Sequence, residues 1–312
     1  MTQDDSALTA EDVAKWLKVT KNTVYELVKR RELNHYKVGR KMRFTAPDVE
    51  SYIGRSRDRH GLPEPQPPLA GEAPREGGLF IVCGQDQMLD VLTTRLGSLG
   101  KPGSQALRAY VGSYGGLAAL YRGEAQAASS HLWDGDTDTY NVPYVRRLVP
   151  GTPCALIRLA RRTQGFYVRA GNPSGIKGWE DLGRDGLVLV NREKGAGSRV
   201  LLDERLRLLG IPSASIKGYQ REEPNHLEVA GAVGRGEADL GVGDMKAAAQ
   251  VEGVGFVPLQ QEDYDLVLKK EDMGKPMVKA LLSILRSKEF KEQFRHMKGY
   301  DISSIGEIIA ET

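Results

Sequence analysis

Cysteine is scarce in this sequence, and long hydrophobic runs are absent from it. The 312 residues include only Cys83 and Cys154, whose separation is not that of a metal-binding motif. We interpret both as reduced thiols, which favours the cytoplasm over an oxidising compartment. No stretch approaches the about 18 apolar residues of a transmembrane helix. The start, Met-Thr-Gln-Asp-Asp, lacks the basic and apolar regions of a secretory signal. We therefore expect a cytoplasmic protein with no membrane partner.

The charge of the chain is concentrated at one end. The formal net charge is only +3, and residues 61–312 carry 31 basic and 32 acidic side chains. The first 60 residues carry 13 Lys or Arg and 9 Asp or Glu, and the segment from Lys15 to Arg43 has ten basic and two acidic residues. Such a local positive field indicates that an anionic polymer binds at this end of the chain. A chain of 312 residues has room for two or three domains.

The basic segment has the pattern of a winged helix-turn-helix. Thr9 is placed to cap a first helix, with Asp12 as an imperfect capping-box partner, and Thr20 caps a second helix. Alternating apolar residues around a Gly-centred turn predict a hairpin over 36–44, and Thr45 begins a third helix. The polar half of the second helix would enter a major groove, and the hairpin tip would reach the backbone or the minor groove.

The candidates for DNA contact are polar or basic side chains on the second helix and at the hairpin tip. Asn and Lys side chains can reach base edges, and the arginines can hold phosphates. For Tyr25, packing within the head and contact with DNA are both open. The candidates are Lys21, Asn22, Thr23, Tyr25, Lys29, Arg30, Arg31, Arg40 and Lys41.

The stretch from Leu8 to Ile53 resembles the excisionase or MerR-like winged helix-turn-helix family. The resemblance rests on the order of Asn-Thr-Val-Tyr-Glu-Leu-Val, Lys-Val-Gly-Arg-Lys-Met-Arg-Phe and Asp-Val-Glu-Ser-Tyr-Ile. It implies a DNA-binding domain over residues 1–54; the alternative is a generic helical domain with a solvated basic face. In residues 55–78, five prolines among glycines and charged residues predict a semi-rigid linker.

From Leu79 onwards the sequence alternates between apolar strands and amphipathic helices. Strands are predicted over residues 79–84, which form a continuous apolar run, and over 109–113, 127–132, 187–191 and 238–244, and several end in Gly, Ser or Thr at a helix start. This order predicts an α/β domain over residues 79–312, with a ligand crevice at the carboxyl ends of the strands. Free N–H groups and the helix dipole make such ends suitable for anions.

Two long extended segments, Ala155 to Ala170 and Phe256 to Lys269, are long enough to cross between two lobes. Two crossings predict a cleft between lobe 1, residues 79–160 and 265–312, and lobe 2, residues 161–264, with hinge closure on a ligand. The fold class expected for the whole chain is therefore α/β, with an N-terminal winged helix-turn-helix and a two-lobed binding domain.

This order of elements resembles the type II periplasmic-binding-protein fold, of which Gly-Glu-Ala-Asp-Leu-Gly-Val-Gly is a typical phrase. Three further stretches resemble the intracellular binding domain of molybdenum-related regulators. They are Cys-Gly-Gln-Asp-Gln-Met-Leu-Asp-Val-Leu, Ser-Ser-His-Leu-Trp-Asp-Gly-Asp-Thr-Asp-Thr-Tyr-Asn and Val-Asn-Arg-Glu-Lys-Gly-Ala-Gly-Ser-Arg-Val-Leu-Leu-Asp. The resemblance covers about residues 79–300 and implies an oxyanion effector such as molybdate or tungstate. Gln85 departs from it, because the family has Ser or Thr at that position.

The candidates for ligand contact follow the strand ends. A compact dianion is best held by neutral N–H and O–H donors, to which an arginine can add charge, and a larger organic anion would also suit these ends. For Asp244, a helix cap and a ligand contact are both open. The candidates are Gly84, Gln85, Asp86, Ser113, Tyr114, Ser129, Ser130, His131, Arg192, Gly195, Gly197, Ser198, Arg199 and Asp244.

Three patterns that partly resemble metal-binding, nucleophile or P-loop motifs are interpreted as structural. His131 with Asp134 and Asp136 lacks the convergence of a metal site. Ser198 lacks the Gly-x-Ser-x-Gly frame of a nucleophile elbow, and the Gly-Ala-Gly before it lacks the Gly-Lys-Ser/Thr of a P-loop. Because no acid–base pair stands at a convincing spacing either, we expect no metal, no cofactor and no enzymatic activity.

The combination predicts a one-component transcription regulator. Its head would bind DNA and its receptor domain a small anion, and a homodimer is expected because one short head buries little DNA surface. Two alternatives stay open. One is an enzyme or carrier for a molybdenum-cofactor intermediate or another phosphorylated metabolite. The other is a phage-type architectural protein that bends DNA without a ligand.

Overall fold

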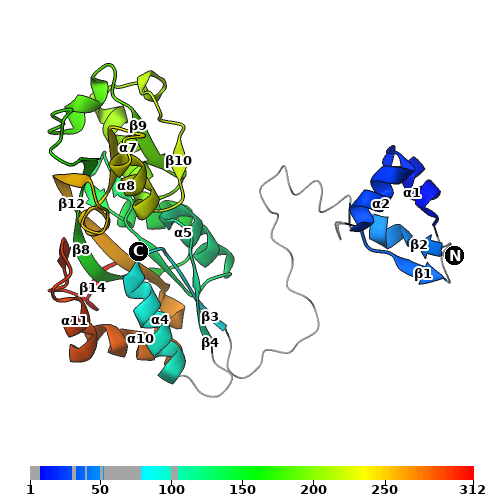
Figure 1. Cartoon of the computed structure of the whole chain (residues 1–312). Coiled ribbons are helices and arrows are strands. Elements are labelled where there is room, and N and C mark those ends of the chain that lie inside the picture. The colour runs from blue at the N-terminus through cyan, green and yellow to red at the C-terminus, as the bar shows by residue number, and fades with distance from the viewer. Residues whose placement is uncertain (1–7, 30–32, 39–40, 50–51, 53–78, 100–104) are drawn as a thin grey trace. The chain divides into compact units, whose positions relative to one another are not determined.

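The computed structural model describes residues 8–29, 33–38, 41–49, 52, 79–99 and 105–312. The chain divides into two compact units, residues 1–72 and 73–312, which we call the head and the receptor (Figure 1). Three of the predicted DNA contacts, Arg30, Arg31 and Arg40, and the predicted linker over 55–78 lie outside the described residues.

The head contains the two helices and the hairpin expected from the sequence. Helix α1 spans Ala10–Leu17 and helix α2 spans Lys21–Lys29, and strands β1 (Tyr36–Val38) and β2 (Lys41–Arg43) pair antiparallel. Residues 46–49 are helical. The side chains of Thr9, Thr20 and Thr45 accept hydrogen bonds from the backbone N–H groups three residues later, so the three predicted N-caps are confirmed.

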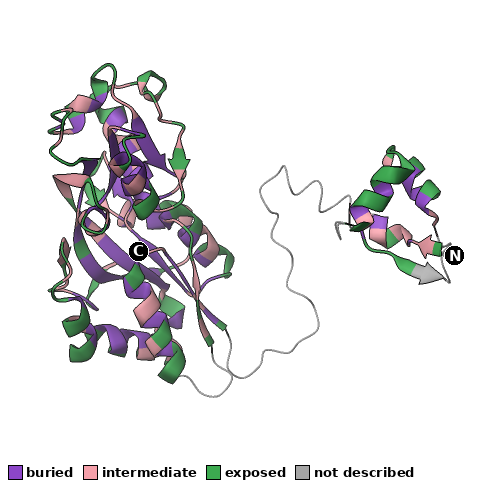
Figure 2. Ribbon diagram, viewed as in Figure 1, coloured by how far each residue is buried: buried purple, intermediate pink, exposed green. Residues whose placement is uncertain are grey.

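A small apolar core holds the head together. Val13 of α1, Val24 of α2, Phe44 after the hairpin and Val49 of the last helical segment are all fully buried. The purple interior of the head in Figure 2 follows these elements. Because Val24 and Leu27 point inward, the opposite face of α2 is left free for contacts with a partner.

The receptor is built on one ten-stranded mixed sheet. Its strand order is β10-β9-β11-β8-β12-β5-β3-β4, and β13 and β14 pair with β8. The parallel strands β3 (Leu79–Cys83), β4 (Gln105–Ala109) and β5 (Ala127–Ser130) lie at one end of the sheet. The parallel strands β9 (Leu189–Arg192), β10 (Glu222–Glu223) and β11 (Leu240–Asp244) lie at the other. The short strands β13 (Tyr300–Asp301) and β14 (Ile308–Glu311) are antiparallel to β8, and β6 (Trp133–Asp134) and β7 (Thr139–Tyr140) form a separate hairpin.

Two long strands run through both ends of the sheet. Strands β8 (Cys154–Arg169) and β12 (Val254–Lys269) have 16 residues each and pair with each other over their whole length. They confirm the two long extended segments expected from the sequence. We call the part with β3, β4 and β5 the β3 lobe and the part with β9, β10 and β11 the β9 lobe (Figure 1).

Helices cover the sheet in both lobes. The β3 lobe has α4 (Gln87–Leu99), α5 (Ser113–Arg122), α6 (Val142–Leu148), α10 (Pro276–Arg286) and α11 (Lys288–Phe294). The β9 lobe has α7 (Gly197–Leu209), α8 (His226–Gly234) and α9 (Met245–Ala248). The 3₁₀ turns are η1 (Trp179–Gly183), η2 (Ser213–Ser215) and η3 (Lys270–Asp272).

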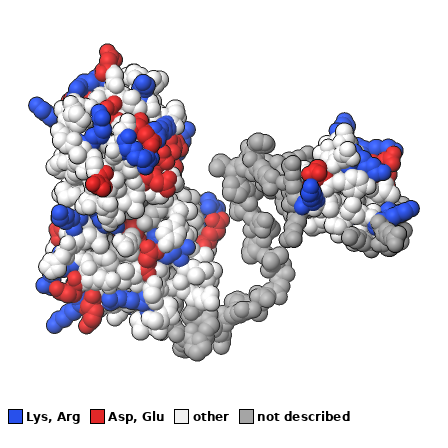
Figure 3. Space-filling view, in the orientation of Figure 1, with Lys and Arg blue, Asp and Glu red and all other residues white. Residues whose placement is uncertain are grey.

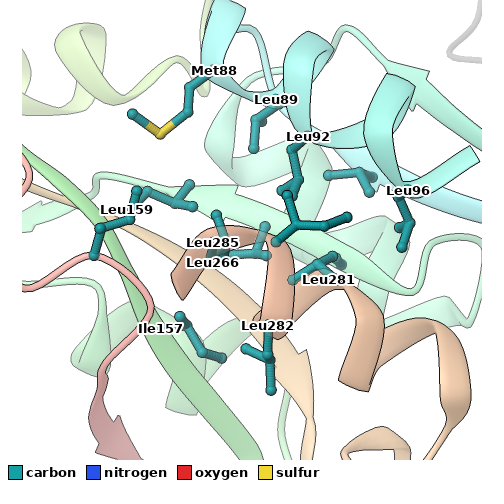
Figure 4. Packing of buried hydrophobic residues seen from close by; sticks show 14 of the residues in the cluster. Met88, Leu89, Leu92, Leu96, Ile157, Leu159, Leu266, Leu281, Leu282 and Leu285 are labelled. Atoms are coloured by element: carbon teal, nitrogen blue, oxygen red, sulfur yellow. The ribbon is translucent and has the colours of Figure 1, made fainter. Parts of the chain in front are cut away.

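The largest apolar cluster fixes helix α4, which reaches the site described below. Leu89, Leu92 and Leu96 of α4 pack with Leu281 and Leu285 of α10 in one cluster, to which the sheet strands also contribute (Figure 4). All five side chains are fully buried. Since a core of this kind is closely packed, the N-terminus of α4 has a fixed position relative to β3.

The two thiols lie inside the receptor. Cys83 and Cys154 are both free and buried, and burial raises the pKa of each thiol. Buried thiols with a raised pKa are poor nucleophiles. In the described parts of the chain, no helix combines the length and the apolar character needed to cross a membrane.

Candidate ligand-binding cavity and DNA-contacting helix

A cavity of about 290 Å³ is lined by residues of both lobes of the receptor. The first residue of each of four helices lines it: Gln87 of α4, Ser113 of α5, Gly197 of α7 and His226 of α8. The first turn of a helix has free N–H groups and carries the positive end of the helix dipole. Because two of these helices belong to each lobe, an anion in the cavity would be held by both.

Local sequence features set two of these helix starts. Gly84 directly follows β3 and has a φ of +147°, and a Cβ atom at this position would overlap the Ser129 side chain, so the turn into α4 requires glycine. Asp86 then accepts a hydrogen bond from the Met88 N–H at 2.7 Å. At α8, the Asn225 side chain caps the helix by accepting from the N–H of Glu228 at 2.9 Å.

A buried charged network forms one wall of the cavity. Nη1 of Arg162, in the middle of β8, lies 3.0 Å from Oδ2 of Asp86, and the same guanidinium pairs with Glu262 of β12. Nζ of Lys246 lies 3.5 Å from Oδ2 of Asp86, and the Tyr300 hydroxyl donates to that oxygen. Asp86, Arg162 and Lys246 all line the cavity. The cations of this wall are therefore matched by carboxylates of the protein.

The carboxylates of this network are charged. Burial raises the pKa of Asp86, but Lys246, Arg162 and the Tyr300 hydroxyl outweigh burial and hold the pKa well below its ordinary value. Burial likewise opposes ionisation of Glu262, and Arg162 and then His131 lower its pKa below the usual range. The wall thus offers little net positive charge, and an anion in the cavity would depend mainly on neutral donors.

His226 is such a donor. It lines the cavity at the start of α8, its Nε2 atom lies 3.8 Å from Oδ2 of Asp244, and its buried Nδ1 has no hydrogen-bond partner among the described residues. Burial, and then the nearby charges of Arg192 and Arg162, lower the pKa of His226 well below its ordinary value. A neutral imidazole carries one N–H that can be donated to an anionic oxygen.

The two lobes touch beside the cavity. Nη2 of Arg192, at the end of β9, donates to Oε1 of Gln85 at 2.6 Å, and Nε2 of Gln85 donates to Glu193 at 3.3 Å. The N–H of Tyr114, in α5, donates to the carbonyl of Gly195 at 3.1 Å. The cleft between the lobes is therefore bridged by hydrogen bonds in this structure.

In the head, one face of α2 is exposed. Lys21, Asn22, Thr23 and Lys29 are exposed, and Tyr25 is 39% exposed, which places its ring outside the core. Lys41 of β2 is exposed as well. Figure 3 shows Lys and Arg side chains on the visible face of the head. A polar and basic helix face of this kind suits a major groove.

Comparison with known families agrees with both units. The profile of a helix-turn-helix domain matches residues 7–57, and the profile of the PBP superfamily domain matches residues 98–286. The chain belongs to the PBP superfamily. Its relatives include YvgK, an uncharacterised protein of Bacillus subtilis, which is 38% identical over 99% of both chains. An uncharacterised protein of Clostridium pasteurianum, from the 5′ region of a 2Fe-2S ferredoxin gene, is 51% identical over 36% of this chain and 99% of its own length.

Solved structures support the same fold for the receptor. One is described as a phosphate ABC transporter substrate-binding protein of Clostridium perfringens with bound phosphate. It covers 72% of this chain and 98% of its own, at 14% identity and a TM-score of 0.52. Another is an ancestral amino acid-binding protein that covers 70% of this chain and 95% of its own, at 18% identity and a TM-score of 0.51. The predicted fold class, a helix-turn-helix followed by a binding-protein-like α/β domain, is confirmed.

In this PBP superfamily member the cavity brings together a part of the predicted ligand set. The predicted residues that line it are Gln85, Asp86, Ser113, Ser129, His131, Arg192, Gly197 and Asp244. The predicted residues that do not line it are Gly84, Tyr114, Ser130, Gly195, Ser198 and Arg199.

The predicted ligand residues that do not line the cavity have other environments in the receptor. Arg199 is turned into the β9 lobe, where it pairs with Asp203 and Glu222 at 3.1 Å each. The hydroxyls of Ser130 and Ser198 are buried and have no hydrogen-bond partner among the described residues. The backbone groups of Gly195 and Tyr114 are used in the contact between the lobes.

Three chemically important lining residues were absent from the predicted set: Arg162, His226 and Lys246. Lys246 follows the end of β11 by two residues, and His226 follows a helix-capping Asn, so both had a local signal. The sequence had no comparable signal for Arg162, which is one of several charged residues within the long strand β8.

The acidic side chains after β5 accept hydrogen bonds from residues of the same segment. Oδ2 of Asp134 accepts from the Thr137 hydroxyl at 2.6 Å, and Oδ1 of Asp138 accepts from the Trp133 ring N–H at 3.0 Å. Within the described ranges, no three His, Cys, Asp or Glu side chains converge as metal ligands would.

Proposed function

We propose that this protein is a DNA-binding regulator that senses a small anion in the receptor cavity. The observation that carries this proposal is the convergence of four helix N-termini on one cavity, in a chain that also carries a helix-turn-helix. Neutral N–H donors at helix starts bind anions without a large countercharge. The head binds the second ligand, double-stranded DNA.

Molybdate and tungstate are the first candidates for the effector. Both are compact dianions, and the sequence resemblance to molybdenum-related regulators supports them. The cavity of about 290 Å³ approaches the lower end of the roughly 300–1,000 Å³ of pockets for drug-sized ligands. A larger organic anion is therefore the second candidate, and binding is proposed without turnover.

The regulatory coupling follows from thermodynamic linkage. An anion changes the affinity for DNA only if it binds the DNA-competent and DNA-incompetent conformations differently. The cavity is lined by both lobes, so its occupancy depends on their separation. We propose a homodimer, because paired heads would bury enough DNA surface for specific binding. Light scattering that gave a monomeric mass with and without DNA would remove the dimer from the proposal.

Thermal unfolding of ligand-stripped protein tests the effector. The panel is molybdate, tungstate, sulfate, phosphate, succinate and glutamate. An anion at about 100 times its dissociation constant adds roughly 2.7 kcal/mol of stability. This corresponds to a rise in melting temperature of about 5–10 °C for a domain of this size. A shift with molybdate or tungstate and not with sulfate supports the oxyanion sensor. A shift with succinate or glutamate alone favours an organic anion, and no shift with any anion contradicts the proposal.

A further inference from the structure

Gln85 holds one of the cations that line the cavity. Its Oε1 atom accepts a hydrogen bond from Nη2 of Arg192 at 2.6 Å, and its Nε2 atom donates to Oε1 of Glu193 at 3.3 Å. Gln85 and Arg192 both line the cavity. Arg192 is almost completely buried, with a side-chain exposure of 2%, whereas Gln85 is only partly buried.

The three cations that line the cavity, Arg162, Lys246 and Arg192, differ in their ion-pair and hydrogen-bond partners. Arg162 pairs with two carboxylates, Asp86 and Glu262, and Lys246 lies beside Asp86. Removing one member of a buried ion pair leaves an uncompensated charge, which is costly. An anion therefore gains little by competing for Arg162 or Lys246.

Arg192 is different because part of its guanidinium faces a neutral acceptor. It pairs through Nε and Nη2 with the Glu193 carboxylate. Its Nη2 also donates to two neutral acceptors, the side-chain carbonyl of Gln85 at 2.6 Å and the Pro224 carbonyl at 3.1 Å. A hydrogen bond between two charged partners is stronger than one between a charged and a neutral partner. An anionic oxygen that replaced the Gln85 carbonyl would therefore make the stronger bond to Arg192.

We infer that Gln85 is an internal competitor of the effector: it occupies Arg192 in the unliganded receptor, and the incoming anion displaces it. The inference rests on the proposed function of the cavity as an anion sensor. Gln85 belongs to the β3 lobe and Arg192 to the β9 lobe. The displacement exchanges a direct hydrogen bond between the lobes for one that runs through the ligand, so position 85 sets the affinity for the effector.

Four variants of the full chain test the inference by isothermal titration with the six anions of the panel above. Gln85→Met keeps the side-chain length and removes the acceptor, and Gln85→Ser is too short to reach Arg192. Gln85→Glu keeps an acceptor for Arg192 and adds a negative charge at the cavity, which repels an incoming anion. The matched control is Gln293→Met, because Gln293 also accepts from an arginine, Nη2 of Arg95 at 2.8 Å, but is exposed and does not line the cavity.

We expect Gln85→Met and Gln85→Ser to bind the effective anion roughly tenfold more tightly than the wild type, which corresponds to about 1.4 kcal/mol. Gln85→Glu is expected to bind at least about tenfold more weakly, and Gln293→Met as the wild type does. Circular dichroism establishes that each variant is folded.

Two results would overturn the inference, and they differ in what they say of the proposed function. If the wild type binds an anion and Gln85→Met binds it equally or more weakly, Gln85 is not a competitor, while the anion sensor stands. If neither the wild type nor Gln85→Met nor Gln85→Ser binds any of the six anions, both the competitor and the anion sensor fail. Binding by the two variants and not by the wild type would support both.

Discussion

Nη1 of Arg162 lies 3.0 Å from Oδ2 of Asp86, and both side chains are at most 3% exposed. The contact joins the middle of the crossing strand β8 to the residue that precedes α4. Arg162 also stacks on the ring of Tyr264, with its guanidinium carbon 3.9 Å from the ring centroid. The wall of the cavity and the strand shared by the two lobes are therefore one electrostatic unit.

Arg162→Met is expected to destabilise the receptor by about 3–5 kcal/mol, because the buried carboxylates of Asp86 and Glu262 would lose their shared partner. Urea unfolding measures this change. The matched control is Lys270→Met, which removes the exposed pair between Lys270 and Glu311 at 2.6 Å and should cost less than about 1 kcal/mol. A loss of under 1 kcal/mol for Arg162→Met would show that the network does not stabilise the fold.

Gly197→Ala should weaken anion binding by roughly tenfold or more. A Cβ atom on Gly197 would overlap the ring of His131, whose Nδ1 lies 2.8 Å from Oε2 of Glu262. Helix α7 and the residue that follows β5 would therefore have to separate. Isothermal titration with the effective anion measures the loss. In the control, Gly97→Ala, the added methyl group meets nothing within 4 Å. It should stabilise α4 by about 0.5–1 kcal/mol and leave the affinity unchanged. Equal affinities for Gly197→Ala and the wild type would contradict close contact between the lobes in the bound state.

Lys29→Ala in α2 should weaken binding to a non-specific DNA duplex and reduce the slope of log affinity against log salt by about 0.9, the value for one lost phosphate contact. Lys29 is exposed at the end of the helix that we propose to lie in the major groove. Fluorescence anisotropy over a series of salt concentrations measures the slope. Lys288→Ala, an exposed lysine of the receptor, is the control with an unchanged slope. An unchanged slope for Lys29→Ala as well would place the DNA on another face of the head.

Local signals in the sequence were sufficient for most of the fold. The caps at Thr9, Thr20 and Thr45 depend on residues only three positions apart, and the structure has all three. Strand β4 was misplaced: a strand was predicted over 109–113, but β4 spans Gln105–Ala109 and α5 begins at Ser113. The reason is that β4 is an edge strand with polar residues, which lacks the apolar run of the buried strands.

The candidate site was predictable only where it follows strand ends. Asp244 ends a strand and His131 and Asp86 follow strands within three residues, and all three line the cavity. Arg162 reaches the cavity from the middle of β8, so its role depends on how two distant parts of the chain cross. Arg199 lies two residues beyond Gly197, and the helical rotation between them turns its side chain away from the cavity towards Asp203.

His226 makes the stability of the receptor depend on pH. Its pKa in the folded protein is well below the ordinary value, mainly because of burial, whereas in the unfolded chain it titrates near about 6.5. Below that pH the unfolded state binds a proton that the folded state does not. The free energy of unfolding therefore falls as the pH drops from about 7.5 to 5.5, by up to about 1.4 kcal/mol per pH unit for this one group. His226→Gln should remove this part of the slope in urea unfolding at a series of pH values. His296→Gln should not, because His296 is exposed. If His226→Gln kept the slope of the wild type, His226 would bind protons equally in the folded and unfolded states, and burial would not hold its imidazole neutral.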